Sequence, residues 1–317
     1  DDRDRIETVN RGFGDMVGSR YGELSGKTLL EAFRNPALHE ARERFRKTGR
    51  TVSEEIALGE EGRPLILDVT ISAIEGATGE SQKTMLVFHD VTRLKQLERI
   101  RADFVANVTH EIKTPLTAII GFVETLQAGA FDDRDTALRF LGILHEHALR
   151  LNRLVDDLLT LSAIETGDTA LHPAALKVSD VLDAALTILD ARIRKKGLTL
   201  SKDIPADLPP IRADRDRGVQ ILLNVLDNAV KFTPPGGALS AAAAPGEDGE
   251  VVIRIADTGV GVPQSDVPRL GERFYRVDRA RSRELGGTGL GLSIVKHLMA
   301  AHGGRMHIDS APGRGTT

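Results

Sequence analysis

The stretch Gly287-Thr288-Gly289-Leu290-Gly291-Leu292-Ser293-Ile294-Val295 joins three alternating glycines directly to an apolar segment with helical character. Free backbone N–H groups at the start of a helix form an anion site, and glycine has no side chain that would block a phosphate. A run of this kind also occurs in flexible hinges, so it gains meaning only from the sequence around it. The pattern indicates a phosphate-binding loop in an α/β domain.

A polar stripe lies upstream, on a helix predicted from about Asp214 to Phe232. At about 100° per residue, Asn224, Asn228 and Lys231 fall within an arc of roughly 60°. Two carboxamide oxygens and an ammonium group suit Mg²⁺ and phosphate, because Mg²⁺ prefers hard oxygen ligands and usually keeps phosphate and water in its shell. Taken alone, such a stripe is more often a solvated helix face.

Asp257 ends a strand predicted over 251–256 and is followed by Gly259 and Gly261. A carboxylate at this position can accept a hydrogen bond from an exocyclic amine, and the glycines would let the backbone approach a flat ring. Ordinary turns use the same residue types. Further upstream in the same α/β region, Ser179 is expected to cap a helix that runs to Lys196 and ends at Gly197.

From Arg93 onward, apolar residues follow a helical period in two runs, which Gly129 and the Asp132-Asp133 pair separate into a hairpin. Each helix has one apolar stripe that it cannot bury alone, so a dimeric four-helix bundle is predicted, and a plain coiled-coil linker is the alternative. The two stripes are Leu97, Phe104, Val108, Ile112, Ile119 and Leu126, and then Leu141, Leu144, Ala148, Leu151, Val155 and Leu158.

Residues 1–92 mix short strands with small helices. Strands are predicted over 51–58, over 65–71 and over 85–89, and a hairpin connection is predicted at 59–62. The plain interpretation of this region is a small α+β domain.

The order of these signals strongly resembles a bacterial sensor histidine kinase of a two-component system. Residues 223–233 look like the N-box of its ATP-binding domain, and residues 287–295 match its second glycine box. The stretch Phe104-Val105-Ala106-Asn107-Val108-Thr109-His110-Glu111-Ile112-Lys113-Thr114-Pro115-Leu116 looks like its H-box, and residues 272–278 resemble the F-box of a mobile lid. The order of the parts is similar to that of the phosphate-regulon sensors.

The resemblance implies a multidomain α+β protein in three parts. Residues 1–92 would be a PAS-like sensory domain whose first elements are trimmed, and residues 93–168 the dimerisation and histidine phosphotransfer hairpin. Residues 169–317 would be an α/β-sandwich ATP-binding domain of the histidine kinase, chaperone and gyrase type, trimmed before its last strand.

The resemblance also implies roles for individual residues. His110 would be the phosphoacceptor, Glu111 the general base and Thr114 the residue that positions water for phosphatase activity. Glu111 is adjacent to His110 in a helix, so the two do not share a face. Pro115 should kink the helix just past this site. Asn228 would ligate Mg²⁺, and the other ATP-binding residues would be Asn224, Lys231, Phe232, Asp257, Gly259, Gly261, Arg276, Gly287, Thr288, Gly289, Leu290 and Gly291.

The composition limits which classes of partner and of binding site are expected. The 317 residues carry a net charge of −4, which argues against nucleic acid as the main partner, and they include no cysteine for disulfides or thiolate zinc sites. The chain begins without methionine and is interpreted as the cytoplasmic portion of a membrane-anchored bacterial sensor. The expected partners are a second copy of the chain and a response regulator. Two alternatives are a conformational ATPase with the same glycine boxes and a non-catalytic sensory scaffold.

Overall fold

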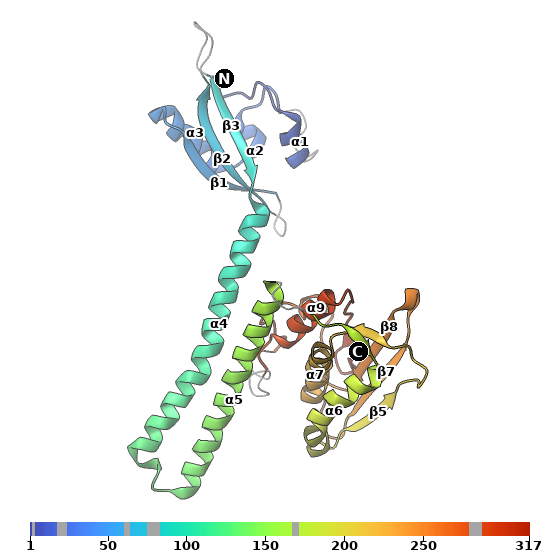
Figure 1. Ribbon diagram of the computed structural model, residues 1–317. Helices are drawn as coiled ribbons and strands as arrows, with labels where there is room; N and C mark the ends of the chain where they lie inside the picture. The colour runs from blue at the N-terminus through green and yellow to red at the C-terminus, as the bar shows by residue number, and fades with distance from the viewer. Residues whose placement is uncertain (2–3, 18–23, 60–63, 75–82, 167–170, 279–286) are drawn as a thin grey trace. The chain divides into compact units, whose positions relative to one another are not determined.

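A computed structural model of the 317-residue chain describes all residues except 2–3, 18–23, 60–63, 75–82, 167–170 and 279–286 (Figure 1). The chain forms two compact units, Asp1–Val105 and Ala106–Thr317. Part of the predicted hairpin connection at 59–62 and the expected domain boundary at 168 lie outside the described residues.

The first unit is built on an antiparallel sheet with the order β1-β2-β3, formed by β1 (Val52–Leu58), β2 (Leu65–Ile74) and β3 (Lys83–Asp90). The side chains of Leu67, Val69 and Ile71 alternate along β2 and are fully buried, which is the period of a strand with one face in the core. Short helices pack on this face, so the predicted small α+β arrangement is confirmed. They are α1 (Arg11–Val17), α2 (Leu29–Phe33) and α3 (Pro36–Thr48).

The helical hairpin consists of α4 (Thr92–Thr125), a short turn η2 (Leu126–Ala130) and α5 (Arg134–Glu165). Gly129 adopts a φ of 118°, and Asp133 caps α5 by accepting from the Asp135 N–H, so the predicted break lies where expected. The rings of Phe122 and Phe140 pack across the hairpin with centroids 5.1 Å apart. The helix α4 continues through Pro115 as one element.

The rest of the second unit is an α/β sandwich. A five-stranded sheet has the order β5-β7-β8-β10-β9, and the helices α6 and α7 lie together on one side of it (Figure 1). Fully buried side chains such as Leu182, Leu226 and Leu239 join these two layers in one core. The strands are β5 (Thr199–Asp203), β7 (Ala238–Pro245), β8 (Val251–Asp257), β9 (Ser310–Ala311) and β10 (Gly315–Thr316), with a separate pair β4 (Ala174–Leu176) and β6 (Ile211–Ala213).

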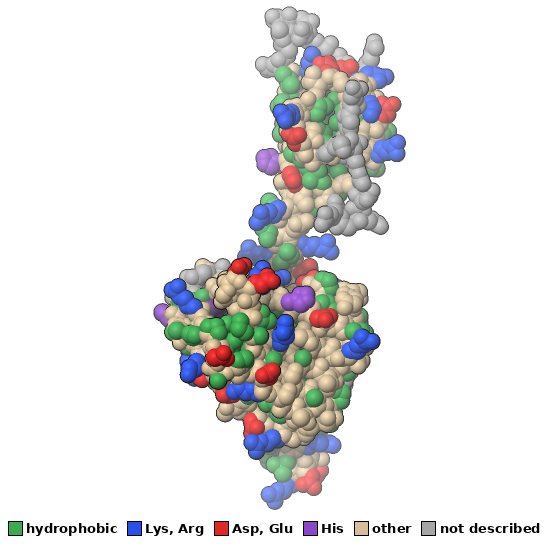
Figure 2. Space-filling view, turned by 90° about the vertical axis from the view of Figure 1, so that its right-hand side faces the viewer, with side chains coloured by type: hydrophobic (Ala, Val, Ile, Leu, Met, Phe, Trp, Pro, Cys, Tyr) green, Lys and Arg blue, Asp and Glu red, His purple; other side chains and the backbone are tan. Residues whose placement is uncertain are grey.

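The helices of this sandwich are α6 (Val178–Lys195), α7 (Arg215–Phe232) and α9 (Gly291–Ala301), with single turns η3 (Glu247–Gly249) and η4 (Val267–Arg269). The expected cap of α6 is wrong, because Lys177 occupies the N-cap without a side-chain bond, and the Ser179 hydroxyl bonds to Asp180 instead. Gly197 ends this helix as predicted, with a φ of 63°. On one face of the second unit, charged side chains of both signs lie beside a hydrophobic patch (Figure 2).

Candidate active site

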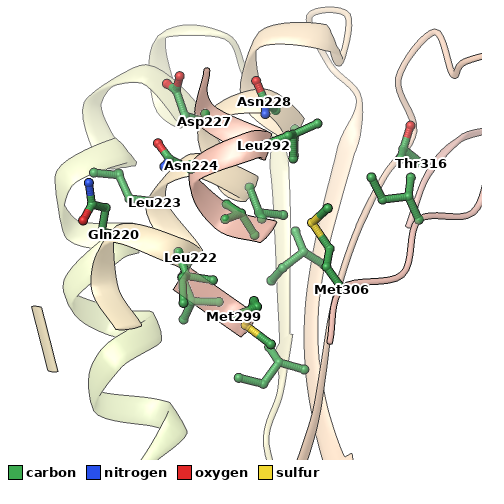
Figure 3. A pocket seen from close by; sticks show the side chains of 18 of the residues that line it. Gln220, Leu222, Leu223, Asn224, Asp227, Asn228, Leu292, Met299, Met306 and Thr316 are labelled. Carbon is green, nitrogen blue, oxygen red and sulfur yellow. The ribbon is translucent and has the colours of Figure 1, made fainter. Parts of the chain in front are cut away.

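A cavity of about 1630 Å³ lies between α7, β8 and the loop that leads into α9. It has two ends of different chemistry. Asn224, Asp227 and Asn228 lie together at the polar end, whereas Leu222, Met299 and Met306 line the apolar end (Figure 3). Most of the predicted nucleotide residues line this cavity: Asn224, Asn228, Lys231, Phe232, Asp257, Gly261, Arg276, Gly287, Thr288, Gly289 and Gly291.

Two predicted contact residues do not line this cavity. Leu290 is fully buried as the N-cap residue of α9, and Gly259 is buried against neighbouring backbone. Both residues are therefore buried beneath the residues that line the cavity. The sequence pattern could not separate these supporting positions from the lining ones, because the glycine boxes mix both kinds.

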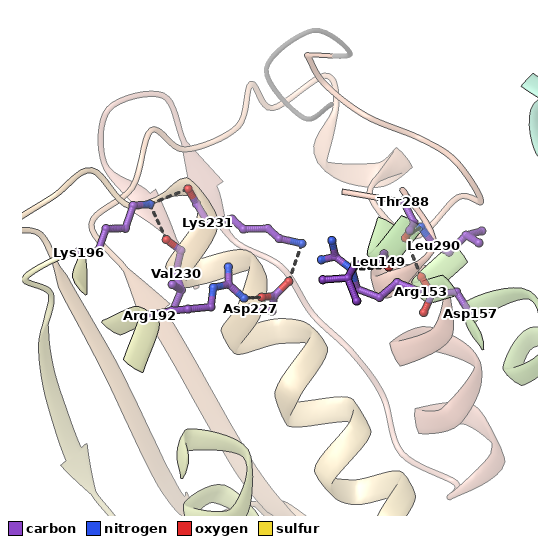
Figure 4. A network of polar contacts seen from close by, with 10 residues as sticks. All are labelled: Leu149, Arg153, Asp157, Arg192, Lys196, Asp227, Val230, Lys231, Thr288 and Leu290. Carbon is purple, nitrogen blue, oxygen red and sulfur yellow. Dashed lines mark hydrogen bonds and ion pairs between the residues drawn. The ribbon is translucent and has the colours of Figure 1, made fainter. Parts of the chain in front are cut away.

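The helix α7 presents the polar stripe, and its two ends are held by side chains. Asp214 caps its start by accepting from the N–H groups of Asp216 and Arg217. At its end, the Lys196 Nζ donates to the carbonyl oxygens of Val230 (2.6 Å) and Lys231 (2.9 Å), as Figure 4 shows. These contacts satisfy carbonyls that have no partner within the helix.

Asn224 has a polar atom that fits a bound ligand. Its side-chain Nδ2 is buried and has no hydrogen-bond partner among the described residues. A buried amide donor without an acceptor is unfavourable, so such groups in native proteins usually have a partner. A phosphate oxygen would supply the missing acceptor, which is the chemistry that the polar stripe predicts.

Lys231 is held in the site by an ion pair that the sequence interpretation missed. Its Nζ lies 2.6 Å from the Asp227 Oδ2, and Arg192 on α6 contacts the other oxygen of Asp227 (Figure 4). Burial alone would raise the pKa of Asp227, but Lys231 and Arg192 outweigh it and bring the pKa below its usual value. The i, i+4 spacing of Asp227 and Lys231 is the signal that would have revealed this pair.

The glycines after Asp257 are also required by the packing of the chain's own backbone. A Cβ atom at Gly259 would lie 2.8 Å from the carbonyl oxygen of Phe232, and one at Gly261 would lie 1.9 Å from that of Ala311. Close approach of the chain's own backbone therefore requires glycine at both positions, and the predicted approach of a flat ring stays a prediction. The arrangement fixes Asp257, whose Oδ1 accepts from the Gly259 N–H at 2.7 Å and whose pKa burial raises.

Gly261 provides a test of this packing. We expect Gly261→Ala to lower the free energy of unfolding by about 2–5 kcal/mol, because it adds both a clash and a strained positive φ. Gly303→Ala is the matched control, since Gly303 has a similar φ of 73° but no atom within 4 Å of the added Cβ. The control should lose only about 1 kcal/mol in chemical denaturation. Equal losses in the two variants would show that the contact with Ala311 is unimportant.

Gly289 of the second glycine box packs against Phe274 in the segment 272–278, the predicted lid. Gly289 has a φ of 76°, and a Cβ atom there would lie 2.9 Å from the Cα of Phe274. The Phe274 N–H donates to the Gly289 carbonyl at 2.8 Å. This hydrogen bond holds the backbone two residues before Arg276 against the glycine loop. The helix α9 then begins at Gly291 without a side-chain cap. Its first N–H groups are therefore suited to an anion.

His110 and Glu111 point in different directions on α4. The side chain of His110 is exposed, and its imidazole has no hydrogen-bond partner within the described part of the chain. The Glu111 Oε2 accepts from Arg150 Nη2 at 2.9 Å and from Arg276 Nη2 at 3.0 Å. Thr114, one turn on, donates its hydroxyl hydrogen to the His110 carbonyl at 3.0 Å.

A second contact joins the hairpin to the nucleotide site. The Thr288 hydroxyl donates to the Asp157 Oδ2 at 2.7 Å, and burial raises the pKa of Asp157 (Figure 4). Together with the Glu111–Arg276 pair, this contact places two hairpin carboxylates on donors of the predicted ATP site. Arg150 and Asp157 could not be predicted as part of the site, because no local sequence pattern marks their partners.

A metal ion at this site would have few protein ligands. Among the residues described, no group of three or more His, Cys, Asp and Glu side chains could hold a metal ion. A Mg²⁺ ion at the Asn228 carboxamide would therefore take most of its ligands from phosphate and water, which is the usual preference of this ion.

Comparisons with known proteins show which domain families this chain matches. Residues 213–317 match the family of histidine kinase-, DNA gyrase B- and HSP90-like ATPases, residues 100–167 match the His Kinase A (phospho-acceptor) domain, and residues 1–96 match the PAS fold. A sensor protein kinase WalK from Staphylococcus aureus is 34% identical over the whole chain, which covers 75% of that relative. The chain belongs to the sensor histidine kinase family. A WalK from Bacillus subtilis is 36% identical over 80% of the chain.

The chain spans only 41% of the length of the Bacillus relative. Among solved structures, the histidine kinase ThkA in complex with the response regulator TrrA superposes with a TM-score of 0.56 over 98% of this chain and 90% of that one, at 20% identity, and shows the shared fold. Full-length ShkA in complex with AMPPNP is 29% identical, with a TM-score of 0.50 over 68% of this chain and 44% of that one. The multidomain fold expected from the sequence is confirmed, whereas the individual site roles remain predictions.

Proposed function

We propose that this sensor histidine kinase phosphorylates its own His110 from Mg-ATP and passes the phosphoryl group to an aspartate of a response regulator. The observation that carries the proposal is the cavity itself, which is lined together by the stripe of α7, by Asp257 and by Gly287, Thr288, Gly289 and Gly291. The same unit presents the exposed His110. The AMPPNP bound to the related ShkA supports a nucleotide at this site.

The proposed reaction is an in-line displacement at the γ-phosphorus. An imidazole nitrogen of His110 forms the new N–P bond while the bond from phosphorus to the bridging oxygen of ADP breaks. Glu111 accepts the proton that leaves the other ring nitrogen. The protein contributes mainly positioning and neutralisation of charge, with Asn228 holding Mg²⁺ and Asn224, Lys231 and Arg276 facing the phosphates.

The decisive experiment is incubation of the protein with γ-labelled ATP. Label that is lost in acid and kept in alkali would identify phosphohistidine. The absence of such label, with nucleotide binding intact, would overturn the kinase proposal and favour a conformational ATPase or a non-catalytic sensory scaffold.

The hairpin supports a homodimer as the active form. Its helices carry apolar side chains that are exposed in the single chain, and a second hairpin would cover them in a four-helix bundle. They include Leu116, Ile120, Val123, Leu138, Leu141 and Leu149. None of the helices in the described residues is long and apolar enough to cross a membrane. Tethering to a membrane and the absence of nucleic-acid binding stay expectations.

Thr114 provides a test of the proposed phosphatase activity. Its hydroxyl donates to the His110 carbonyl, which leaves its oxygen lone pairs to orient a water molecule. We expect Thr114→Ala to leave phosphorylation of His110 unchanged and to slow dephosphorylation of the partner regulator by about tenfold or more. The assay follows the decay of purified phospho-regulator with each variant, and Thr114→Ser is the control that keeps a hydroxyl. Equal acceleration by the wild type and Thr114→Ala would show that the hydroxyl has no such role.

A further inference from the structure

One carboxylate oxygen of Glu111, the residue that follows His110 in the sequence, is shared by two arginines. The Glu111 Oε2 lies 2.9 Å from Arg150 Nη2 and 3.0 Å from Arg276 Nη2. All three side chains are largely buried, with exposed fractions of 14% for Glu111, 12% for Arg150 and 5% for Arg276. A buried carboxylate requires a cation or strong hydrogen bonds, so at least one of these arginines must stay with it.

The two arginines come from different parts of the unit. Arg150 lies on α5, and Glu111 lies on α4, at about the same distance from the hairpin turn. Their contact is therefore internal to the hairpin and depends only on how the two helices pair. Arg276 belongs to the segment that Gly289 fixes beside the nucleotide site.

In the proposed reaction, Arg276 would also bind the terminal phosphate. If Arg276 moves to the terminal phosphate during transfer, its Nη2 leaves the Glu111 carboxylate. Glu111 would then keep a single cationic partner, Arg150. A guanidinium held at 2.9 Å fixes the position of the carboxylate and compensates its negative charge. Without it, the carboxylate would be left buried and without a compensating charge during the transfer.

We propose that Arg150 is a positioning residue for the phosphorylation of His110, acting through Glu111. The inference rests on the proposed kinase function. Arg150 holds the Glu111 carboxylate on α4 while Arg276 moves to the phosphate, and the Glu111 carboxylate takes the proton from the imidazole as the N–P bond forms. Arg150 itself touches neither ATP nor the imidazole.

The test compares the maximal rate and the KM for ATP of self-labelling in full-chain variants. We expect Arg150→Gln to lower the maximal rate about tenfold while the KM for ATP stays within about twofold. Arg150→Lys, which retains a positive charge, should recover part of the rate. Arg139→Gln is the matched control, because Arg139 is an exposed residue of the same helix whose guanidinium stacks on Phe140.

The double variant separates positioning from general stability. Glu111→Gln alone should lower the rate about a hundredfold, and Arg150→Gln added to it should cause no further loss, because its effect passes through the carboxylate. Thermal unfolding of each variant shows whether it is folded. Arg150→Met takes the place of Arg150→Gln if the latter does not fold.

Failure of the proposed Arg150 role and failure of the proposed kinase function give different results. A rate unchanged in Arg150→Gln, a further tenfold loss in the Glu111→Gln background, or an equal loss in Arg139→Gln would overturn the role of Arg150 while the kinase function stands. Wild-type protein that binds ATP but acquires no label on His110 would overturn the proposed function and this inference with it.

Discussion

His110→Ala is expected to carry no phosphoryl label after incubation with γ-labelled ATP, while its affinity for nucleotide stays within about twofold of the wild type. The reason is the separation of the two sites. The His110 side chain is exposed on α4 and is not part of the cavity lining. Removing the imidazole therefore removes the nucleophile without altering the nucleotide contacts. Labelling and the binding of a fluorescent ATP analogue measure the two effects on one preparation.

The control for this variant is another histidine of the hairpin. His145 is exposed on α5, and His145→Ala should be labelled as strongly as the wild type. Label that persists at the wild-type level in His110→Ala would exclude His110 as the acceptor. Label lost equally in both variants would point to damage of the hairpin instead.

Asn228→Ala is expected to weaken Mg-dependent ATP binding by about 10- to 100-fold, the effect of losing one contact to a charged group. The imidazole of His110 is unchanged in this variant, so His110 itself should stay competent as an acceptor. The measurement is nucleotide affinity with Mg²⁺ and again with a chelator, because a loss that acts through the metal should shrink when Mg²⁺ is removed. Asn152→Ala is the control, since Asn152 is an exposed residue of α5 that bonds to Asp156. The same loss with and without Mg²⁺ would contradict the metal role.

A mixed dimer of His110→Ala and Asn228→Ala subunits tests how the phosphoryl group moves. Each parent homodimer should remain unlabelled or nearly so. Label in the mixed dimer would require transfer between subunits. No label, in a sample shown to contain heterodimers, would assign the transfer to one subunit.

The sequence determined the parts of this protein whose structure depends on nearby residues. The period of the apolar residues defined α4, α5 and α7, and Gly129 with Asp133 marked the turn of the hairpin. The stripe of Asn224, Asn228 and Lys231 could be predicted for the same reason, because helical geometry alone places residues three and four apart on one face.

Only the tertiary structure decided which distant side chains meet. Arg150 pairs with Glu111 across the hairpin, and Asp157 accepts from Thr288 of the glycine loop. Both contacts depend on the packing of whole elements, and a single sequence carries no periodic signal for such pairings. The need for glycine at position 261 has the same origin, since the carbonyl of Ala311 approaches it only in the folded domain. Local propensity sets the elements, and long-range packing sets the contacts through which they act on one another.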